Sequence, residues 1–272
     1  MSARHKEFNN LKIHTQYSIC EGAIKIDELA NYCKNNKIKA VGLADSYNLC
    51  GALEFAEKIS KVGTQPIIGT QINVLSDNVL GKITLYATSE LGYKNLTKLS
   101  SKSYLKDKNF SEPYCEIEDL ILNNKDLIIL TGSYTNFFGK LFYSNKLKLI
   151  EKLIKKIKAS FHDRFYIEIQ RHGEEQEINY ENYMLKLSSS NSIPIIASQE
   201  VFYLDQNMAE AHDALICIGE KQFIDDKNRF RYSDQHYLKR NEDIQTLYKD
   251  IPEALENNYN FPLRFSFKPK KS

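Results

Sequence analysis

The sequence predicts an α/β fold in which strands and helices alternate along the chain and close into a β/α barrel. Short apolar runs that suit buried parallel strands recur, and between them lie stretches with apolar residues three and four positions apart, as on one face of a helix. Roughly seven such repeats pass before residue 205. A length of 272 residues is long for one domain but normal for a barrel.

The first part of the chain shows this alternation clearly. Polar and apolar residues alternate at 10–14 and predict a short strand, and a helix follows at 26–33, where apolar residues recur at helical spacing. Further strands are expected at 37–43, 66–74 and 82–87, with a helix at 51–62. The order β-α-β-α-β predicts a parallel sheet with right-handed crossovers.

The pattern continues and then stops after Leu204. Strands are expected at 127–131, 164–170 and 193–197, and helices at 91–99, 146–157 and 178–188, whereas 101–118 has the composition of a loop. Helices are then expected at 208–218, at 242–248 and from Pro252, where proline suits a first helical turn, with an irregular stretch at 219–240 and a linker-like tail at 264–272. We therefore divide the chain into a barrel, 1–205, and a helical and irregular extension of the same domain, 206–272.

Composition excludes several classes of protein. An apolar fraction of 42% predicts a packed core, and a formal charge of +2 from 37 basic and 35 acidic residues argues against tight independent DNA binding. No apolar run reaches membrane-spanning length, and the first residues lack the apolar core of a signal peptide. Five scattered cysteines fit reduced thiols and a cytoplasmic protein, with Cys33 and Cys217 in the core.

Polar side chains gather directly after the first two strands. The stretch from Leu11 to Gly51 is predicted as strand, loop, helix, strand and loop, with the polar residues in the two loops. Because parallel strands end at one rim of a barrel, we expect a site at that rim. The chain has no GxxxxGK phosphate loop and no Gly-x-Ser-x-Gly nucleophile turn.

The order of several segments resembles one known family. They include Leu11–Ser18, Ala44–Phe55, Tyr166–Gly173, Ile193–Leu204, Asp225–Arg231 and Asp250–Asn257. Together they resemble the N-terminal PHP (polymerase and histidinol phosphatase) domain of bacterial replicative DNA polymerase alpha subunits. The resemblance implies a distorted seven-stranded β/α barrel and a chain that is one part of a polymerase. The carboxylates for nucleotide addition would lie downstream, and Asp225 and Asp226 would be structural.

The resemblance also implies nine positions for metal ligands at the barrel rim. Active members of the family bind zinc, manganese or magnesium there, which is the chemistry of phosphoester hydrolysis. In this chain the positions are occupied by Lys12, His14, Glu21, Ser46, Gln71, Lys82, His172, Glu200 and Phe202. Only the two histidines and the two glutamates retain ligating side chains, because lysine ammonium repels a cation, serine and glutamine are poor ligands and phenylalanine has none.

We therefore expect a vestigial pocket with no metal, no cofactor and no catalytic residue in this chain. Lys12 would pair with Glu21 or Glu200 and replace the links that a metal would make. His14 is expected to be a hydrogen-bonded structural residue and His212 a packing or capping residue. His5, His162 and His236 lie in polar surroundings and are assigned to no site.

Three options for function follow from the resemblance. The first is a non-catalytic module that stabilises the polymerase and docks the separate proofreading exonuclease, with DNA contacted only through the full-length polymerase and no membrane partner. The second is a metal-dependent 3′–5′ exonuclease or phosphoesterase that uses the reduced set His14, Glu21, His172 and Glu200. A stand-alone phosphatase of the histidinol-phosphate type is a third option, against which the segments at 232–238 and 250–255 argue.

Overall fold

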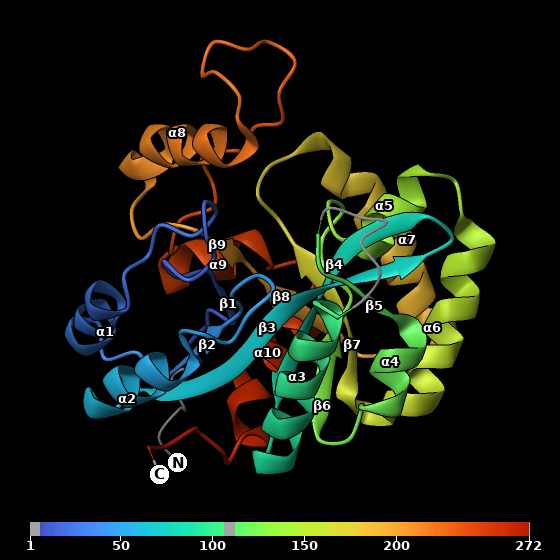
Figure 1. Cartoon of the computed structure of the whole chain (residues 1–272), viewed down its shortest axis with the longest axis horizontal. Helices are drawn as coiled ribbons and strands as arrows, with labels where there is room; N and C mark the ends of the chain where they lie inside the picture. The colour runs from blue at the N-terminus through green and yellow to red at the C-terminus, as the bar shows by residue number, and fades with distance from the viewer. Residues whose placement is uncertain (1–5, 106–111, 272) are drawn as a thin grey trace.

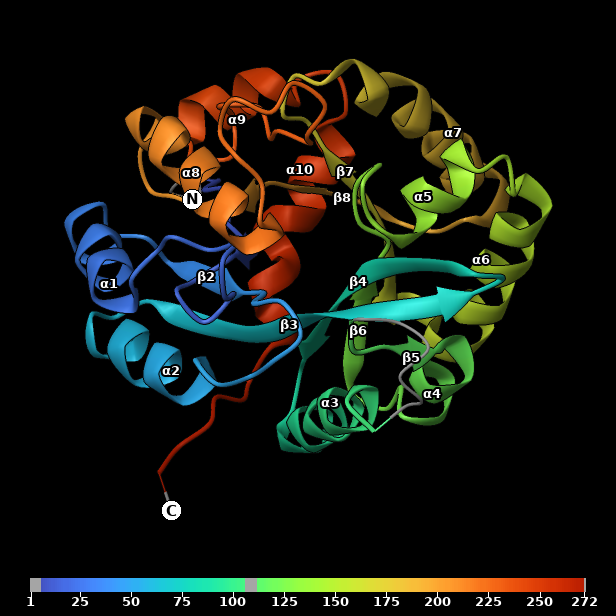
Figure 2. The same cartoon turned by 45° about the horizontal axis from the view of Figure 1, so that its top comes forward.

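In the computed structural model, which describes residues 6–105 and 112–271, the strands form one nearly closed ring surrounded by helices (Figures 1 and 2). In spatial order the ring contains β8 (Ile195–Ser198), β7 (Phe165–Gln170), β6 (Leu127–Leu130), β4 (Val79–Ala87), β3 (Gln65–Ser76), β2 (Ala40–Leu43), β1 (Lys12–Ile13) and β9 (Glu200–Val201). A short strand outside the ring, β5 (Cys115–Glu116), pairs with β3. The predicted barrel is confirmed.

The ring closes through the chain itself. β8 pairs with β7 and β9 pairs with β1, and only Gln199 separates β8 from β9. If β8 and β9 are counted as one bent strand, the described ring has the seven strands that the resemblance implies. The rim residue Glu200 therefore faces Lys12 directly across a parallel strand pair.

The prediction of a parallel sheet is wrong at β4, which runs antiparallel to both β3 and β6. The reason is a tight hairpin, because Asp77 and Asn78 have φ of 48° and 60° between the paired residues Ser76 and Val79. Positive φ at both central residues is what a two-residue hairpin turn of type I′ requires, and Asp and Asn tolerate it. β4 nevertheless brings Lys82 to the rim, where its Nζ contacts Glu21 and Ser46.

Helices surround the ring, and most of them cover its outside. They are α1 (Ile26–Asn35), α2 (Ala52–Lys61), α3 (Glu90–Ser103), α4 (Ile117–Leu122), α5 (Phe137–Tyr143), α6 (Leu147–Phe161), α7 (Glu175–Asn191), α8 (Ala209–Glu220), α9 (Asn241–Leu247) and α10 (Pro252–Asn260). The predicted loop at 101–118 is wrong at both ends, which lie in α3, β5 and α4, while 106–111 lie outside the described residues. The short α5 was not predicted. Within the described residues no helix is long and apolar enough to cross a membrane.

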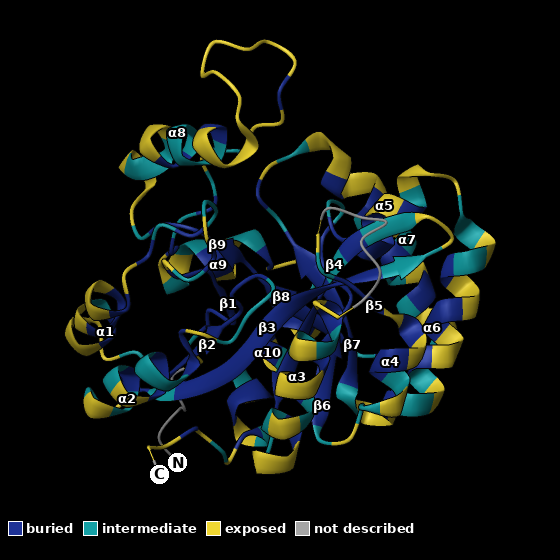
Figure 3. Ribbon diagram, in the orientation of Figure 1, coloured by how far each residue is buried: buried dark blue, intermediate teal, exposed yellow. Residues whose placement is uncertain are grey.

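Side chains on the strands alternate between the outer core and the barrel interior. On β7, Ile167 and Ile169 join the outer core, whereas Tyr166 belongs to an inner cluster and Glu168 faces Lys12. We call the end of the barrel that carries Glu200 and Lys12 its upper end. The interior is polar toward that end and apolar toward the opposite, lower end, and both parts are buried (Figure 3). A period of two therefore builds the apolar shell and the polar interior from the same strands.

Residues from the C-terminal part complete the lower interior. α10 packs beside β8, and the Asn258 side chain donates hydrogen bonds to the carbonyls of Asn9 and Ala197 at 2.9 and 3.0 Å. Phe261, from the turn that follows α10, packs edge-on against the rings of Tyr86 and Tyr166. These rings close the barrel at the end opposite the polar rim.

A projecting element, which we call the α8 arm, consists of α8 and the loop 221–231 (orange in Figure 1). The loop lies within the stretch predicted to be irregular and contains no helix or strand. Arg229 holds it, since its buried guanidinium pairs with both carboxylate oxygens of Asp213 on α8 and also donates to the Ile224 carbonyl at 3.2 Å. The arm is therefore braced although it extends away from the barrel.

Candidate functional site

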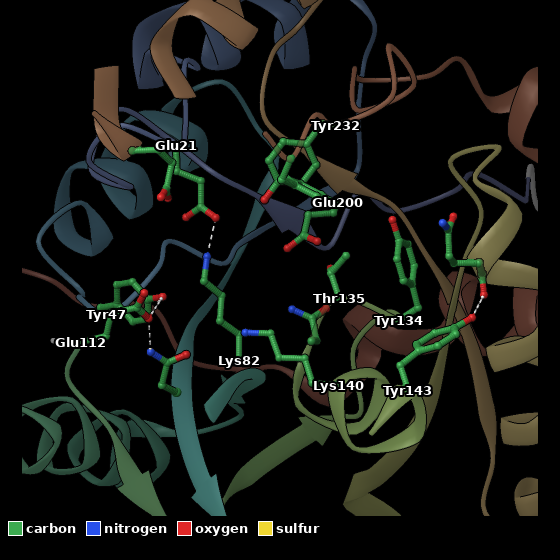
Figure 4. Close-up of a pocket in the computed structure, with 15 residues that line it drawn as sticks. Glu21, Tyr47, Lys82, Glu112, Tyr134, Thr135, Lys140, Tyr143, Glu200 and Tyr232 are labelled. Carbon is green, nitrogen blue, oxygen red and sulfur yellow. Dashed lines mark hydrogen bonds and ion pairs between the residues drawn. The ribbon is translucent and has the colours of Figure 1, made fainter. Parts of the chain in front are cut away.

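The structure brings all nine positions implied by the resemblance together at the upper rim of the barrel. They line or lie beneath a polar cavity of about 500 Å³, whose walls include Glu21, Tyr47, Lys82, Lys140, Glu200 and Tyr232 (Figure 4). Lys12, Gln71, His14 and Phe202 are fully buried below or beside this cavity. Their proximity follows from the barrel, which places the ends of β1, β2, β3 and β9 next to one another.

Glu200 is the centre of the first group of contacts. Its Oε1 accepts hydrogen bonds from Gln71 Nε2 at 2.6 Å and lies 3.0 Å from His14 Nε2 and 3.5 Å from Lys12 Nζ. Burial alone disfavours the charged carboxylate, but Lys12 and His14 outweigh burial and hold the pKa of Glu200 well below its usual value. Of the two predicted partners for Lys12, the structure selects Glu200 and not Glu21.

Glu168 is the second partner of Lys12, and sequence reasoning missed it. Its Oε1 lies 3.5 Å from Lys12 Nζ, with both side chains fully buried. Glu168 was part of the predicted strand at 164–170, and the period of two places it on the interior face. The only sequence signal was its charge, since the other interior positions of this strand, Tyr166 and Gln170, are uncharged.

The second group of contacts surrounds Glu21 and Lys82. Glu21 accepts hydrogen bonds from Lys82 Nζ and Ser46 Oγ, and Lys82 Nζ also lies 3.0 Å from Ser46 Oγ. Burial opposes the charge on Lys82, but Glu21 dominates and raises the pKa of Lys82 above its usual value. The pKa of Glu21 is lowered, because Lys82 and His14 outweigh its own burial. Lys82 is therefore a cation at the rim at neutral pH.

At the rim, the imidazole of His172 stacks on the imidazole of His236. The two ring centroids are 3.9 Å apart, with an interplanar angle of 5°. The Glu200 backbone N–H donates to His172 Nε2 at 3.2 Å, which leaves His172 Nδ1 to donate to Glu177 at 3.1 Å. Burial, with His236 and Lys239 nearby, lowers the pKa of His172 well below its usual value, so the imidazole is neutral.

The expectation that His236 belongs to no site is wrong. It is buried, it stacks on His172, and its Nδ1 donates to the Glu200 carbonyl at 3.1 Å. The irregular sequence around it gave no periodic signal. His5 lies outside the described residues.

Phe202 fills the last position with an apolar ring. The ring is fully buried, with its centroid 4.7 Å from that of His14 and 5.2 Å from that of His212. His212 Nε2 donates to the Glu21 carbonyl at 2.8 Å, which agrees with a packing residue. His14 Nδ1 lies 3.3 Å from Ser18 Oγ, and this agrees with a hydrogen-bonded structural histidine.

The side chains present do not fit a metal cluster. Among the residues that the structure describes, no group of three or more His, Cys, Asp or Glu side chains is arranged to hold a metal ion. Glu21 and Glu200, which could ligate, are engaged by Lys82 and Lys12. An ammonium group repels a cation and has no lone pair to donate.

Comparison with known proteins places this geometry in a family. The model of the PHP domain matches residues 10–172, more than half of the chain. The chain belongs to the PHP domain family.

Curated relatives of this PHP domain are much longer proteins. The DNA polymerase III alpha subunit of Caulobacter vibrioides is 32% identical over 276 residues, covering 97% of this chain and 24% of that protein. The subunit of Rickettsia prowazekii is 34% identical, and the match covers 96% of this chain and 22% of that protein. The subunit of Haemophilus influenzae is 33% identical, and the match covers 92% of this chain and 22% of that protein. The chain thus spans about a quarter of the length of these relatives and is homologous to that part of them.

A solved structure shares the fold. It is that of a candidate metal-dependent phosphoesterase from Bifidobacterium adolescentis, with a TM-score of 0.50 and 10% identity. The match covers 71% of this chain and 86% of that one. At this identity the likeness concerns the fold alone.

The charge on Glu200 gives a testable pH dependence. A carboxyl with a lower pKa in the folded state contributes stability that is present above its unfolded pKa, near 4.5, and is lost as the pH falls through the folded value. We expect Glu200→Gln to lower the free energy of unfolding by about 2 kcal/mol at pH 7, since it weakens hydrogen bonds to a charged acceptor. The deficit should shrink below pH 4.5 in urea titrations.

Glu256→Gln is the matched control, because Glu256 is exposed on α10. Its effect on the free energy of unfolding should be small at every pH. A Glu200→Gln deficit that stays constant from pH 7 to pH 3 would contradict the assigned ion pairs.

Proposed function

We propose that this PHP domain is part of a bacterial replicative DNA polymerase alpha subunit and that it is structural rather than catalytic. The observation that carries this proposal is the position of two lysines. Lys12 and Lys82 place their ammonium groups on Glu200 and Glu21, in the region where active members of the family bind metal. Ion pairs then link strands that a metal cluster would otherwise link.

Polymerase activity, on this proposal, belongs to the rest of the subunit. The similar alpha subunits are about four times longer than this chain, so they have ample length for the nucleotidyltransferase centre. The domain would meet DNA only within the whole polymerase, in the cytoplasm. A formal charge of +2 over 272 residues is consistent with a domain that does not bind DNA tightly by itself.

Docking of the proofreading exonuclease is the second part of the proposal, and the α8 arm is the surface that suits it. Four large apolar side chains on the arm are half or more exposed: Ile218, Phe223, Ile224 and Phe230. Apolar side chains gathered on a braced element are typical of protein interfaces. The order that Arg229 imposes reduces the entropy lost on binding.

Removing that brace should loosen the arm without unfolding the barrel. We expect Arg229→Met to increase the rate of chymotrypsin cleavage within 221–231 roughly tenfold at pH 7, because local opening controls cleavage. Arg231→Met is the control, since the Arg231 side chain is exposed and donates to the Ile224 carbonyl but does not hold Asp213 by a hydrogen bond among the residues that the structure describes. Equal cleavage rates for the two variants would contradict the bracing role.

The catalytic question is tested by elemental analysis and a hydrolysis assay on one sample. The purified chain is exposed to zinc and manganese, desalted, analysed for bound metal and assayed on single-stranded DNA. We expect no stoichiometric metal and no cleavage. Bound metal with cleavage that disappears in His14→Ala would overturn the proposal and favour a nuclease.

Docking is tested separately by titrating the chain with the proofreading exonuclease subunit of the same organism. We expect the double variant Phe223→Ser and Ile224→Ser to weaken binding at least about tenfold, as loss of interface anchors does. Leu263→Ser, an exposed leucine at the opposite end of the barrel, is the control and should bind normally. Unchanged binding by the double variant would exclude the arm as the docking surface.

A reduced-ligand exonuclease or phosphoesterase is the second candidate function. The observation in its favour is that His14, Glu21, His172 and Glu200 are all retained at one rim. Against it, both carboxylates are bound by lysine or amide donors and His172 Nε2 accepts a backbone hydrogen bond. The metal analysis described above separates the two candidates.

A further inference from the structure

A buried polar layer crosses the barrel interior just below the rim. We call it the inner polar layer, and it consists of Lys12, Gln71, Glu168, Gln170, Ser198 and Glu200. Two carboxylate oxygens organise it: Glu200 Oε1 accepts from Gln71 Nε2 at 2.6 Å, and Glu168 Oε1 accepts from Gln170 Nε2 at 2.8 Å. Lys12 Nζ lies 3.5 Å from each of these two oxygens. Ser198 is the strand partner of Gln170.

Several atoms of this layer have no hydrogen bond within the part of the chain that the structure describes. They are Lys12 Nζ, Gln71 Oε1, Glu168 Oε2, Gln170 Oε1 and Ser198 Oγ. Buried polar atoms are nearly always hydrogen-bonded, and each unsatisfied one costs stability. Five such atoms on adjacent or facing strands, with an ammonium group among them, indicate a site that also binds a small polar species.

The chemistry of these atoms defines that species. Three of the five atoms, Gln71 Oε1, Glu168 Oε2 and Gln170 Oε1, can only accept hydrogen bonds, so they cannot bind an anion. The carboxylates of Glu168 and Glu200 would also repel an anion. Charge-assisted N–H···O contacts are normally 2.7–2.9 Å, and the separation of 3.5 Å around Lys12 Nζ leaves the ammonium without a direct hydrogen bond. Water both donates and accepts hydrogen bonds, so it is a species that suits Lys12 and the free oxygens together.

We propose that the inner polar layer is a binding site for a protonated primary amine, occupied by the side chain of Lys12 and completed by buried water. The charges support an amine as the occupant. Lys12 faces two carboxylates, Glu168 and Glu200, while His14 also lies against the Glu200 carboxylate and Lys82 is held by Glu21. The free oxygens of Gln71 and Gln170 in the layer are neutral amide oxygens, which suit N–H donors better than they suit a divalent metal.

Truncation of Lys12 provides the test, because Lys12→Ala removes atoms equivalent to propylammonium. We expect the variant to melt at a lower temperature than the wild type and to recover a few degrees, saturably, in propylammonium chloride, since a ligand that binds only the folded state stabilises it. The same concentrations of 1-propanol and of sodium chloride should have no such effect. Lys156→Ala, an exposed lysine on α6, is the matched variant and should not respond to the amine.

Each other outcome overturns the inference. No recovery, or equal recovery in propanol, would show a cavity without selectivity for an amine. Recovery in zinc or manganese chloride but not in propylammonium would show a latent metal site. The inference rests on the proposed structural role, because it describes the site that holds Lys12. A failure to bind the exonuclease would not affect this inference, since the measurements above involve no partner protein.

A second measurement applies if Lys12→Ala does not fold. In a double-mutant cycle at pH 7, Glu168→Gln should destabilise the wild type but destabilise Lys12→Met less, or stabilise it, because it removes a carboxylate that has lost its cation. Additive effects of the two substitutions would contradict an amine site built on Glu168.

Discussion

Lys12→Met is expected to lower the free energy of unfolding by about 3–5 kcal/mol, the usual cost of removing one partner from a buried ion pair. The methionine fills most of the same space, but Glu168 and Glu200 then remain buried without the ammonium between them. Gln71 and His14 still donate to Glu200, whereas within the described residues Glu168 retains only Gln170 as a side-chain donor. Most of the loss should therefore come from Glu168.

Urea titration at pH 7 measures this change, with Lys156→Met as the control. Lys156 pairs with Glu118 on the surface, where ion pairs are screened by water and contribute little. A loss below about 1 kcal/mol for Lys12→Met, similar to the control, would mean that the interior ion pairs are not needed for stability.

Phe261→Ala is expected to cost a similar amount, about 3–5 kcal/mol, because it leaves a cavity among aromatic rings. Phe261 is 1% exposed and contacts the rings of Tyr86, Tyr166 and Phe265 at the lower end of the barrel. The substitution also tests the boundary at residue 205, since it asks whether residues after that point contribute to the core of the barrel.

The matched control is Leu263→Ala, two positions away and 76% exposed. Its effect should lie within about 0.5 kcal/mol. If Phe261→Ala unfolded in a separate, earlier transition that left the barrel intact, the C-terminal part would be an independent unit rather than part of the core.

The strands and helices of the barrel were predictable because their burial is periodic. β2 and β6 are apolar throughout, and α6 buries Ile150, Ile154 and Ile157 on one face. The direction of β4 was not predictable from its apolar pattern, because β4 lies in the ring and is largely buried like the parallel strands. The signal was the pair Asp77 and Asn78, whose turn geometry reverses the chain.

The resemblance was enough to predict which residues lie at the rim, but not which contacts they make. Lys12 and Glu168 lie on strands that β9 and β8 separate in the ring, so only the closed barrel brings them together. His236 belongs to an irregular segment whose course depends on tertiary contacts, such as its stack on His172. Sequence patterns report local structure, whereas these contacts depend on how distant segments meet.

Closure of the ring also has a consequence for synthesis on the ribosome. β1 obtains one of its two neighbours only when β9 exists, and the contact of His14 with Glu200 spans 186 positions. At about 5–20 residues per second, this span takes on the order of 10–40 s to translate. During that time the first strand has an open edge, and Lys12 lacks its two carboxylates until first Glu168 and then Glu200 are synthesised. Chaperones that shield nascent strands therefore have a long interval in which to act on this chain before the barrel can close.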